Sequence, residues 1–143
     1  MKNKEKKPSI CNCLNLRRAS AVITKIYDEK LAPSGLTVSQ FSILKHLKLL
    51  GAASVSDLAV KIRLDRTTLV RNLKPLEAVS FIIDVSQKGT RNRELQLTEK
   101  GIEKCIEAEC LWKDAQNFIE QKLGKENIEK LTSLLSMIES LGA

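Results

Sequence analysis

The chain has 143 residues, 43% of them hydrophobic and 29% charged, so it can fold around one core. Aromatic residues make up only 3%, which leaves aliphatic side chains to fill that core and favours helices packed on helices. The formal net charge of +7 favours an anionic partner, nucleic acid before an acidic membrane surface. No apolar run approaches the length of a membrane span, and no signal core follows the first lysines. We therefore expect a cytoplasmic chain without a membrane partner.

The first part of the chain is expected to be a basic arm followed by two helices. Residues 1–9 are polar and rich in lysine. Apolar residues then recur at spacings of three and four until Pro33-Ser-Gly35, which predicts a helix that ends there. Thr37 and Gln40 have the spacing of a capping box, so the second helix is expected to begin after Thr37 and to end at Gly51.

Two shorter helices follow and predict a DNA-binding unit. The first is expected to be capped by Ser54 or Ser56 and the second by Asp65, with only Arg63-Leu64 between them. Two short amphipathic helices joined by such a tight turn form a helix-turn-helix. Pro75 removes one backbone donor late in the second helix, so a kink or a 3₁₀ turn is expected there.

The periodicity then changes to that of a hairpin. Residues 81–85 are rich in β-formers, 87–90 have the composition of a turn, and 93–97 alternate polar with apolar. A hairpin after a helix-turn-helix is a wing. Thr98 is expected to cap a long helix that Gly124 ends, before a last amphipathic helix. The apolar residues assigned to the long helix are Ile102, Ile106, Trp112, Ile119 and Leu123.

The second helix of the unit carries side chains that can recognise bases. Arginine can bridge the O6 and N7 atoms of guanine, asparagine can bridge adenine, and threonine offers a hydroxyl and a methyl group. Residues 67, 71 and 74 share one face at helical spacing. The alternative is a solvated polar face such as every amphipathic helix has. We expect base contacts from Arg66, Thr67, Thr68, Arg71 and Asn72, and a further DNA contact from Lys74.

The neighbouring residues favour DNA over a solvated face. Between Lys61 and Leu97 there are eight basic and four acidic residues, which gives a net charge of +4 (8 − 4). The hairpin tip is a small basic loop that fits a minor groove, where arginine is attracted by the negative potential of narrow A·T tracts. The wing residues expected to contact DNA are Lys88, Arg91 and Arg93.

The four cysteines are expected to be free thiols. Cys11 and Cys13 lie near the start of the first helix among positive charges, which lower the pKa of a thiol and favour redox chemistry. The alternative to a redox role is that Cys105 is a small hydrophobic residue of the core. A C-x-C and a distant C-x₄-C with His46 do not have a usual zinc spacing, so we expect no metal and no cofactor.

Two other classes of protein compete with a DNA-binding regulator. An enzyme would need a nucleophile with a base, or paired carboxylates, yet His46 is the only histidine and lies within an amphipathic helix. We therefore expect no catalytic activity. A helical protein-interaction module is the second alternative, because winged helices also bind proteins; the basic wing favours DNA.

As a set, these residues resemble the MarR family of winged helix-turn-helix regulators, over nearly the whole chain from about Cys11. The matching residues are Leu58-Ala59, Asp65-Arg-Thr-Thr-Leu-Val-Arg71, Leu76-Glu77, Arg91 and Leu97-Thr-Glu-Lys-Gly101. The start Cys11-Asn-Cys13, with Tyr27-Asp28 and Trp112, is similar to a subgroup with an N-terminal Cys-x-Cys. Two positions depart from the family pattern: Ser80 stands where glycine commonly follows the recognition helix, and Gly89 stands where an aspartate usually braces the wing arginine.

The resemblance implies a homodimer that places one recognition helix in each half-site of a palindromic operator in double-stranded DNA. It implies a repressor whose binding a small hydrophobic or phenolic effector modulates; the alternative is a redox-sensing regulator that uses Cys11 and Cys13. The fold class implied is mainly α with a small β-hairpin wing, in one compact subunit. Its parts are a basic arm at 1–9, helical dimerisation regions at 10–34 and 98–143, and a winged helix-turn-helix region at 35–97.

Overall fold

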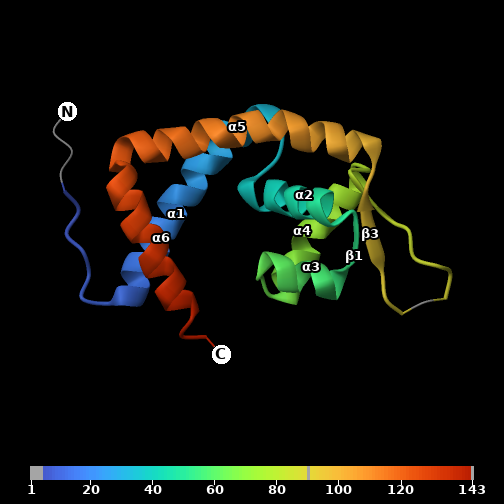
Figure 1. Cartoon of the computed structure of the whole chain (residues 1–143), viewed down its shortest axis with the longest axis horizontal. Coiled ribbons are helices and arrows are strands. Elements are labelled where there is room, and N and C mark those ends of the chain that lie inside the picture. The colour runs from blue at the N-terminus through green and yellow to red at the C-terminus, as the bar shows by residue number, and fades with distance from the viewer. Residues whose placement is uncertain (1–4, 90, 143) are drawn as a thin grey trace.

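One long helix connects two groups of elements (Figure 1). The structure, a computed structural model, describes residues 5–89 and 91–142. The elements are α1 (Asn12–Leu31), the 3₁₀ helix η1 (Ala32–Ser34), α2 (Val38–Leu50), β1 (Ala52–Ser54), α3 (Val55–Ile62), α4 (Arg66–Ala78), β2 (Ile82–Asp84), β3 (Glu94–Leu97), α5 (Glu99–Leu123) and α6 (Lys125–Glu139). Helix α5 spans the molecule, with α1 and α6 at one end and α2, α3, α4 and the sheet at the other. The predicted class, mainly α with a small β wing, is confirmed.

Side-chain caps fix where helices α2, α3, α4 and α5 begin. Thr37 and Gln40 form the predicted capping box, and the side chains of Ser54, Asp65 and Thr98 each accept a hydrogen bond from the third residue of the helix that follows. Each cap satisfies an amide that the helix itself leaves unpaired. Of the two serines considered for α3, Ser54 is the cap.

The sheet has three strands rather than the two of a hairpin. Strand β3 lies between β1 and β2 and is antiparallel to both, with Ala53 opposite Leu95 and Ile83 opposite Gln96. The predicted hairpin is present, but β1 was not predicted. Its three small residues are too few to show the alternation of polar and apolar side chains that indicates a strand. Thr90, part of the predicted turn, lies outside the described residues, as do residues 1–4 of the predicted arm.

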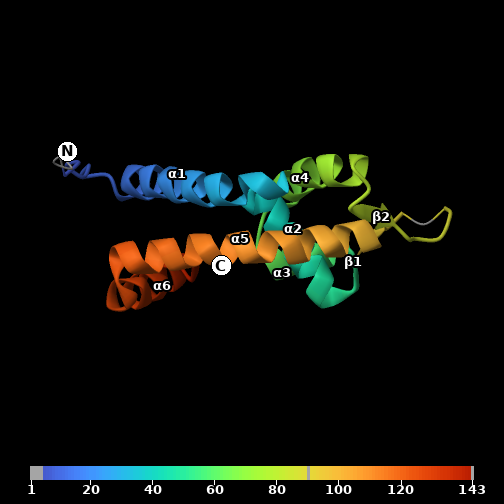
Figure 2. The ribbon, with the colours of Figure 1, turned by 90° about the horizontal axis from the view of Figure 1, so that it is seen from above.

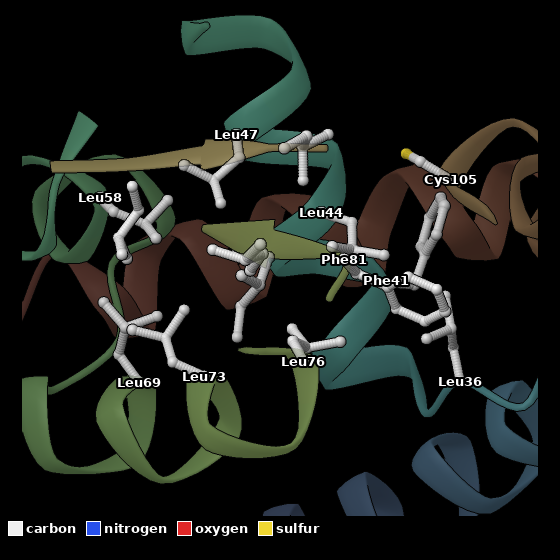
Figure 3. Packing of buried hydrophobic residues seen from close by; sticks show 14 of the residues in the cluster. Leu36, Phe41, Leu44, Leu47, Leu58, Leu69, Leu73, Leu76, Phe81 and Cys105 are labelled. Atoms are coloured by element: carbon white, nitrogen blue, oxygen red, sulfur yellow. The ribbon is translucent and has the colours of Figure 1, made fainter. Parts of the chain in front are cut away.

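The core lies where α2, α3, α4, α5 and the sheet meet (Figure 3). Helix α2 contributes Phe41, Ile43, Leu44 and Leu47, all buried, and Leu58 of α3 packs against them. Helix α4 buries Leu69, Leu73 and Leu76 against the same cluster. Full burial of each such side chain stabilises the fold by about 1.5–3 kcal/mol. Helix α4 is thereby held by one face, and its opposite face is left to solvent.

Helix α5 buries mainly small residues within the subunit, and of the five apolar residues expected on it only Ile119 is among the buried ones. Its buried residues are Gly101, Cys105, Ala108, Ala115 and Ile119, whereas Ile102 is 38% exposed and Ile106 is 52% exposed. Small side chains let α5 approach α2 and α1 closely. A β-carbon added to Gly101 would lie 2.1 Å from the carbonyl oxygen of Phe81, so this contact requires glycine.

The other end of the molecule is only partly covered. Helix α1 contacts α5 and runs obliquely to it in Figure 1, and α6 folds back from the end of α5 (Figure 2). Helix α6 has no buried residue. Its exposed apolar residues are Leu131, Leu134, Leu135, Met137 and Ile138. Among the described residues, no helix is long and apolar enough to cross a membrane.

Candidate nucleic-acid interface

Asp65 fixes the start of the predicted recognition helix, α4. One carboxylate oxygen of Asp65 accepts the backbone amide of Thr68 at 2.9 Å, and the other accepts the Thr68 hydroxyl at 2.6 Å. These hydrogen bonds hold the pKa of Asp65 below its usual value. The Thr68 hydroxyl is therefore a donor within the cap. The helix continues through Pro75 to Ala78 without a 3₁₀ turn, which was one of the two alternatives expected at Pro75.

The side chains predicted to read bases do not form one surface. Thr67, Arg71 and Lys74 are exposed and lie within about 60° of one another around the helix axis. Asn72 is half-buried, and its side-chain amide donates to the carbonyl oxygen of Thr68 at 2.9 Å. Arg66 leaves this face and donates from Nη1 to the hydroxyl of Ser56 on α3 at 3.0 Å. The outward face of α4 thus consists of Thr67, Arg71 and Lys74.

All three wing residues predicted to contact DNA are exposed, but Arg93 is held in ion pairs. Lys88 and Arg91 are exposed near its tip. Arg93 instead forms ion pairs with Glu77 of α4 and with Asp84 of β2, the latter at 3.2 Å from Nε to Oδ2. Arg93 thereby ties the wing to the recognition helix. Asp84 also accepts the hydroxyl and the amide of Ser86, which lower its pKa.

The end of α4 is fastened to the beginning of α5. Ser80 follows the helix with a φ of 62°, the left-handed conformation that favours glycine. The Thr98 hydroxyl donates to the Ser80 carbonyl oxygen at 2.6 Å, and the Lys100 ammonium donates to the Val79 carbonyl oxygen at 3.0 Å. These two hydrogen bonds join the segment after α4 to the first residues of α5.

Sequence reasoning missed three residues that organise this surface. They are Ser56, which holds Arg66, and the two acidic partners of Arg93, Glu77 and Asp84. Ser56 was considered only as a cap, Asp84 only within the predicted hairpin and the charge count, and Glu77 only in the charge count and the family resemblance. Their partners are 9 to 16 residues away in the chain, beyond the reach of helical or strand periodicity.

A cavity of about 550 Å³ lies between α1, α5 and α6, away from the predicted DNA surface. Apolar side chains such as Leu16, Ile23 and Leu131 line it, together with Tyr27 and Gln116. The Tyr27 hydroxyl donates to Oε1 of Gln116, and burial raises the pKa of Tyr27. The cavity has the size and the mixed lining of a small-molecule site.

The cysteines occupy two kinds of environment. Cys11 is the N-cap residue of α1, and Cys11, Cys13 and Cys110 are exposed free thiols. Cys105 is buried under α2, and burial raises the pKa of its thiol, so the predicted role of a small hydrophobe is confirmed. Among the described residues, no group of three or more His, Cys, Asp or Glu side chains could hold a metal ion.

Known proteins resemble the chain in both sequence and structure. The sequence profile of the MarR family matches residues 36–85. The M. tuberculosis transcriptional regulator MosR, solved in complex with DNA, is 30% identical over 93% of this chain and 99% of its own, with a TM-score of 0.77. No curated protein matches the sequence.

Two more distant structures share the fold. Bordetella bronchiseptica BpsR, whose structure concerns regulation of DNA binding by 6-hydroxynicotinic acid, is 22% identical with a TM-score of 0.83, covering 96% of this chain and 99% of its own. A C80S mutant of E. coli MarR in complex with operator DNA is 20% identical with a TM-score of 0.75, covering 92% and 99%.

Proposed function

Because this chain belongs to the MarR family and is a DNA-binding transcriptional regulator, we propose that it represses transcription as a homodimer on a palindromic operator. The observation that carries the proposal is the pairing of two exposed basic surfaces in one subunit: the Thr67, Arg71 and Lys74 face of α4, and the wing with Lys88 and Arg91. The helix suits a major groove, and the wing suits the adjacent minor groove. Such a protein would meet its operator in the cytoplasm.

The uncovered apolar residues of α1 and α6 support the homodimer. Leu14 and Val22 on α1 and the leucines of α6 are exposed in the subunit, and a contiguous exposed apolar patch commonly marks an interface. A second copy related by a two-fold axis would cover it and present two recognition helices. We assign dimerisation to 10–34 and 98–143, and DNA binding to 35–97.

The test is a mobility-shift titration with random and selected duplexes at rising salt. We expect retardation of both at low salt and a steep loss of affinity as salt rises, because each phosphate contact releases counterions. No retardation at low salt would contradict the proposed operator binding through α4 and the wing and would favour a protein-interaction module. We propose no catalytic activity, because the proteins that the chain resembles are transcriptional regulators.

We place the small effector in the cavity between α1, α5 and α6. Its apolar lining suits a hydrophobic or phenolic molecule, and the Tyr27–Gln116 pair offers polar groups to orient it. A first probe is 6-hydroxynicotinic acid, with a matched Tyr27→Phe variant that keeps the ring. Weaker operator binding in the presence of the probe, diminished in the variant, is the expected result. If none of a series of phenolic acids changed the affinity of the protein for its operator, the cavity would not be an effector site for this class of molecule.

A second candidate function is redox sensing through Cys11 and Cys13, which the exposure of both thiols favours. Cys11 has an extended backbone and only Cys13 lies within the helix, so a bond between the two sulfurs would disturb the first turn of α1. Diamide would accept the two electrons and two protons that the thiols release. We expect altered operator affinity after oxidation, and none in a Cys11→Ser/Cys13→Ser variant. Equal affinity of oxidised and reduced wild-type protein would exclude this function.

A further inference from the structure

Arg66 begins the recognition helix, but its side chain lies away from the face that the other basic residues share. Successive residues of a helix are about 100° apart, so Arg66 and Arg71 point about 140° apart. The Arg66 guanidinium lies toward α3, where its Nη1 donates to the Ser56 hydroxyl at 3.0 Å. Arg66 therefore occupies the flank of α4, between the helix and the wing, and not its outward face.

A small basic cavity lies beside this hydrogen bond. Its volume is about 100 Å³, and residues of α3, α4 and the wing line it, among them Ser56, Arg66 and Arg91. Arg93 also borders the cavity, but its charge is paired with Glu77 and Asp84. The described lining contains no carboxylate. Arg66 and Arg91 thus approach one small space from the two elements that would enter neighbouring grooves.

One strand of the sugar–phosphate backbone separates a major groove from the adjacent minor groove. A subunit that inserts α4 into one groove and its wing into the other must straddle that strand. Guanidinium groups bind phosphate oxygens through two parallel hydrogen bonds, and such contacts fix the register of a protein on DNA without reading its sequence. The cavity between Arg66 and Arg91 lies where this strand would pass.

We propose that Arg66 binds a phosphate of the DNA backbone together with Arg91, and that Ser56 positions the Arg66 guanidinium for this contact. The inference rests on the proposed DNA binding and changes the role of Arg66 from a base reader to a backbone contact. Base discrimination by α4 then depends on Thr67 and Arg71, the exposed residues on its outward face.

The first experiment measures Arg66→Gln against wild type, on a selected operator and on a random duplex, over a range of salt concentrations. The slope of log affinity against log salt should become less steep by about 0.9 for each lost contact, or about 1.8 for a dimer. Affinity should fall by the same factor on both duplexes. Lys25→Gln, which removes one positive charge from α1, is the charge-matched control and should leave the slope unchanged.

The second experiment tests Ser56 with a double-mutant cycle. Ser56→Ala should lower affinity several-fold on both duplexes, and Ser56→Thr, which retains a hydroxyl, should restore most of it. In the Arg66→Gln background, Ser56→Ala should cause no further loss, because its effect acts through Arg66. A full additional loss in that background would show that Ser56 acts independently and would overturn its positioning role.

The outcomes separate the inference from the function on which it rests. Wild-type protein that binds neither duplex would overturn both. If the wild-type protein binds DNA, two results for Arg66→Gln would overturn the phosphate contact alone. One is a loss of discrimination between the two duplexes, and the other is an unchanged salt slope. A uniform loss with a reduced slope would establish it.

Discussion

Individual residues of α4 differ in what they can contribute to recognition. Asn72 donates to its own helix and Arg66 to α3, whereas Arg71 is exposed on the outward face. A free side chain on that face can reach base edges, and a side chain held on the flank cannot do so without breaking its contact. Of the five residues that the sequence predicts to contact bases, our proposal therefore retains Thr67 and Arg71.

Replacement of Arg71 by alanine should reduce both affinity and specificity. A bidentate contact to guanine contributes about 1–3 kcal/mol of discrimination, so the preference for the selected operator over a random duplex should shrink by that amount. Parallel titrations of the two duplexes measure the change. An equal loss on both would assign Arg71 to the backbone. Lys74→Ala is the companion variant on the same face and should weaken both duplexes alike.

Ser80 is a residue whose replacement should stabilise the protein. Its left-handed backbone disfavours every side chain with a β-carbon, and glycine adopts it without strain. Ser80→Gly should raise the free energy of unfolding by up to about 1 kcal/mol, measured by urea denaturation. Ser80→Ala retains the β-carbon and serves as the control. A gain in stability from alanine equal to that from glycine would contradict this explanation.

At the scale of elements, the wing is fixed to the recognition helix through Arg93. The family's usual brace is absent, because Gly89 occupies its position, and Glu77 and Asp84 hold a neighbouring arginine instead. Glu77→Gln should loosen the hairpin while leaving global stability nearly unchanged, because partly exposed ion pairs contribute little. Hydrogen exchange of the amides in residues 83–89 and 91–95 should become faster. Glu94→Gln on β3 is the control, and equal effects of both variants would count against a specific brace.

Helix α5 depends on its close contact with the segment after α4. Gly101→Ala would place a β-carbon 2.1 Å from the Phe81 carbonyl oxygen and force the two elements apart. Overpacking of this kind costs about 1–3 kcal/mol, which thermal unfolding would detect. A β-carbon on Gly142 meets only an ordinary contact at 3.5 Å, so Gly142→Ala should be neutral. If Gly101→Ala were as stable as wild type, the close approach would not constrain α5.

At the scale of the whole molecule, the sequence predicted the order and the ends of the elements well, because their signals are local. It predicted the contacts between elements less well. Thr37, Asp65 and Thr98 marked helix starts because a cap acts within three residues. The glycine and alanines that α5 buries were not singled out in the sequence, because small side chains carry a weaker hydrophobic signal than Ile102 and Ile106, which are exposed in the subunit. The bond between Arg66 and Ser56 could not be predicted, because it depends on how α3 and α4 cross.

Recognition of an operator depends on the whole dimer, because each subunit contacts DNA through both α4 and the wing. Two subunits related by a two-fold axis should select a palindrome, with half-sites about one helical turn apart or a multiple of it. Selection of bound sequences from random duplex DNA tests this most directly. The structure predicts an enriched inverted repeat whose half-sites have fixed spacing. No enrichment, or enrichment of a single unrepeated site, would contradict it.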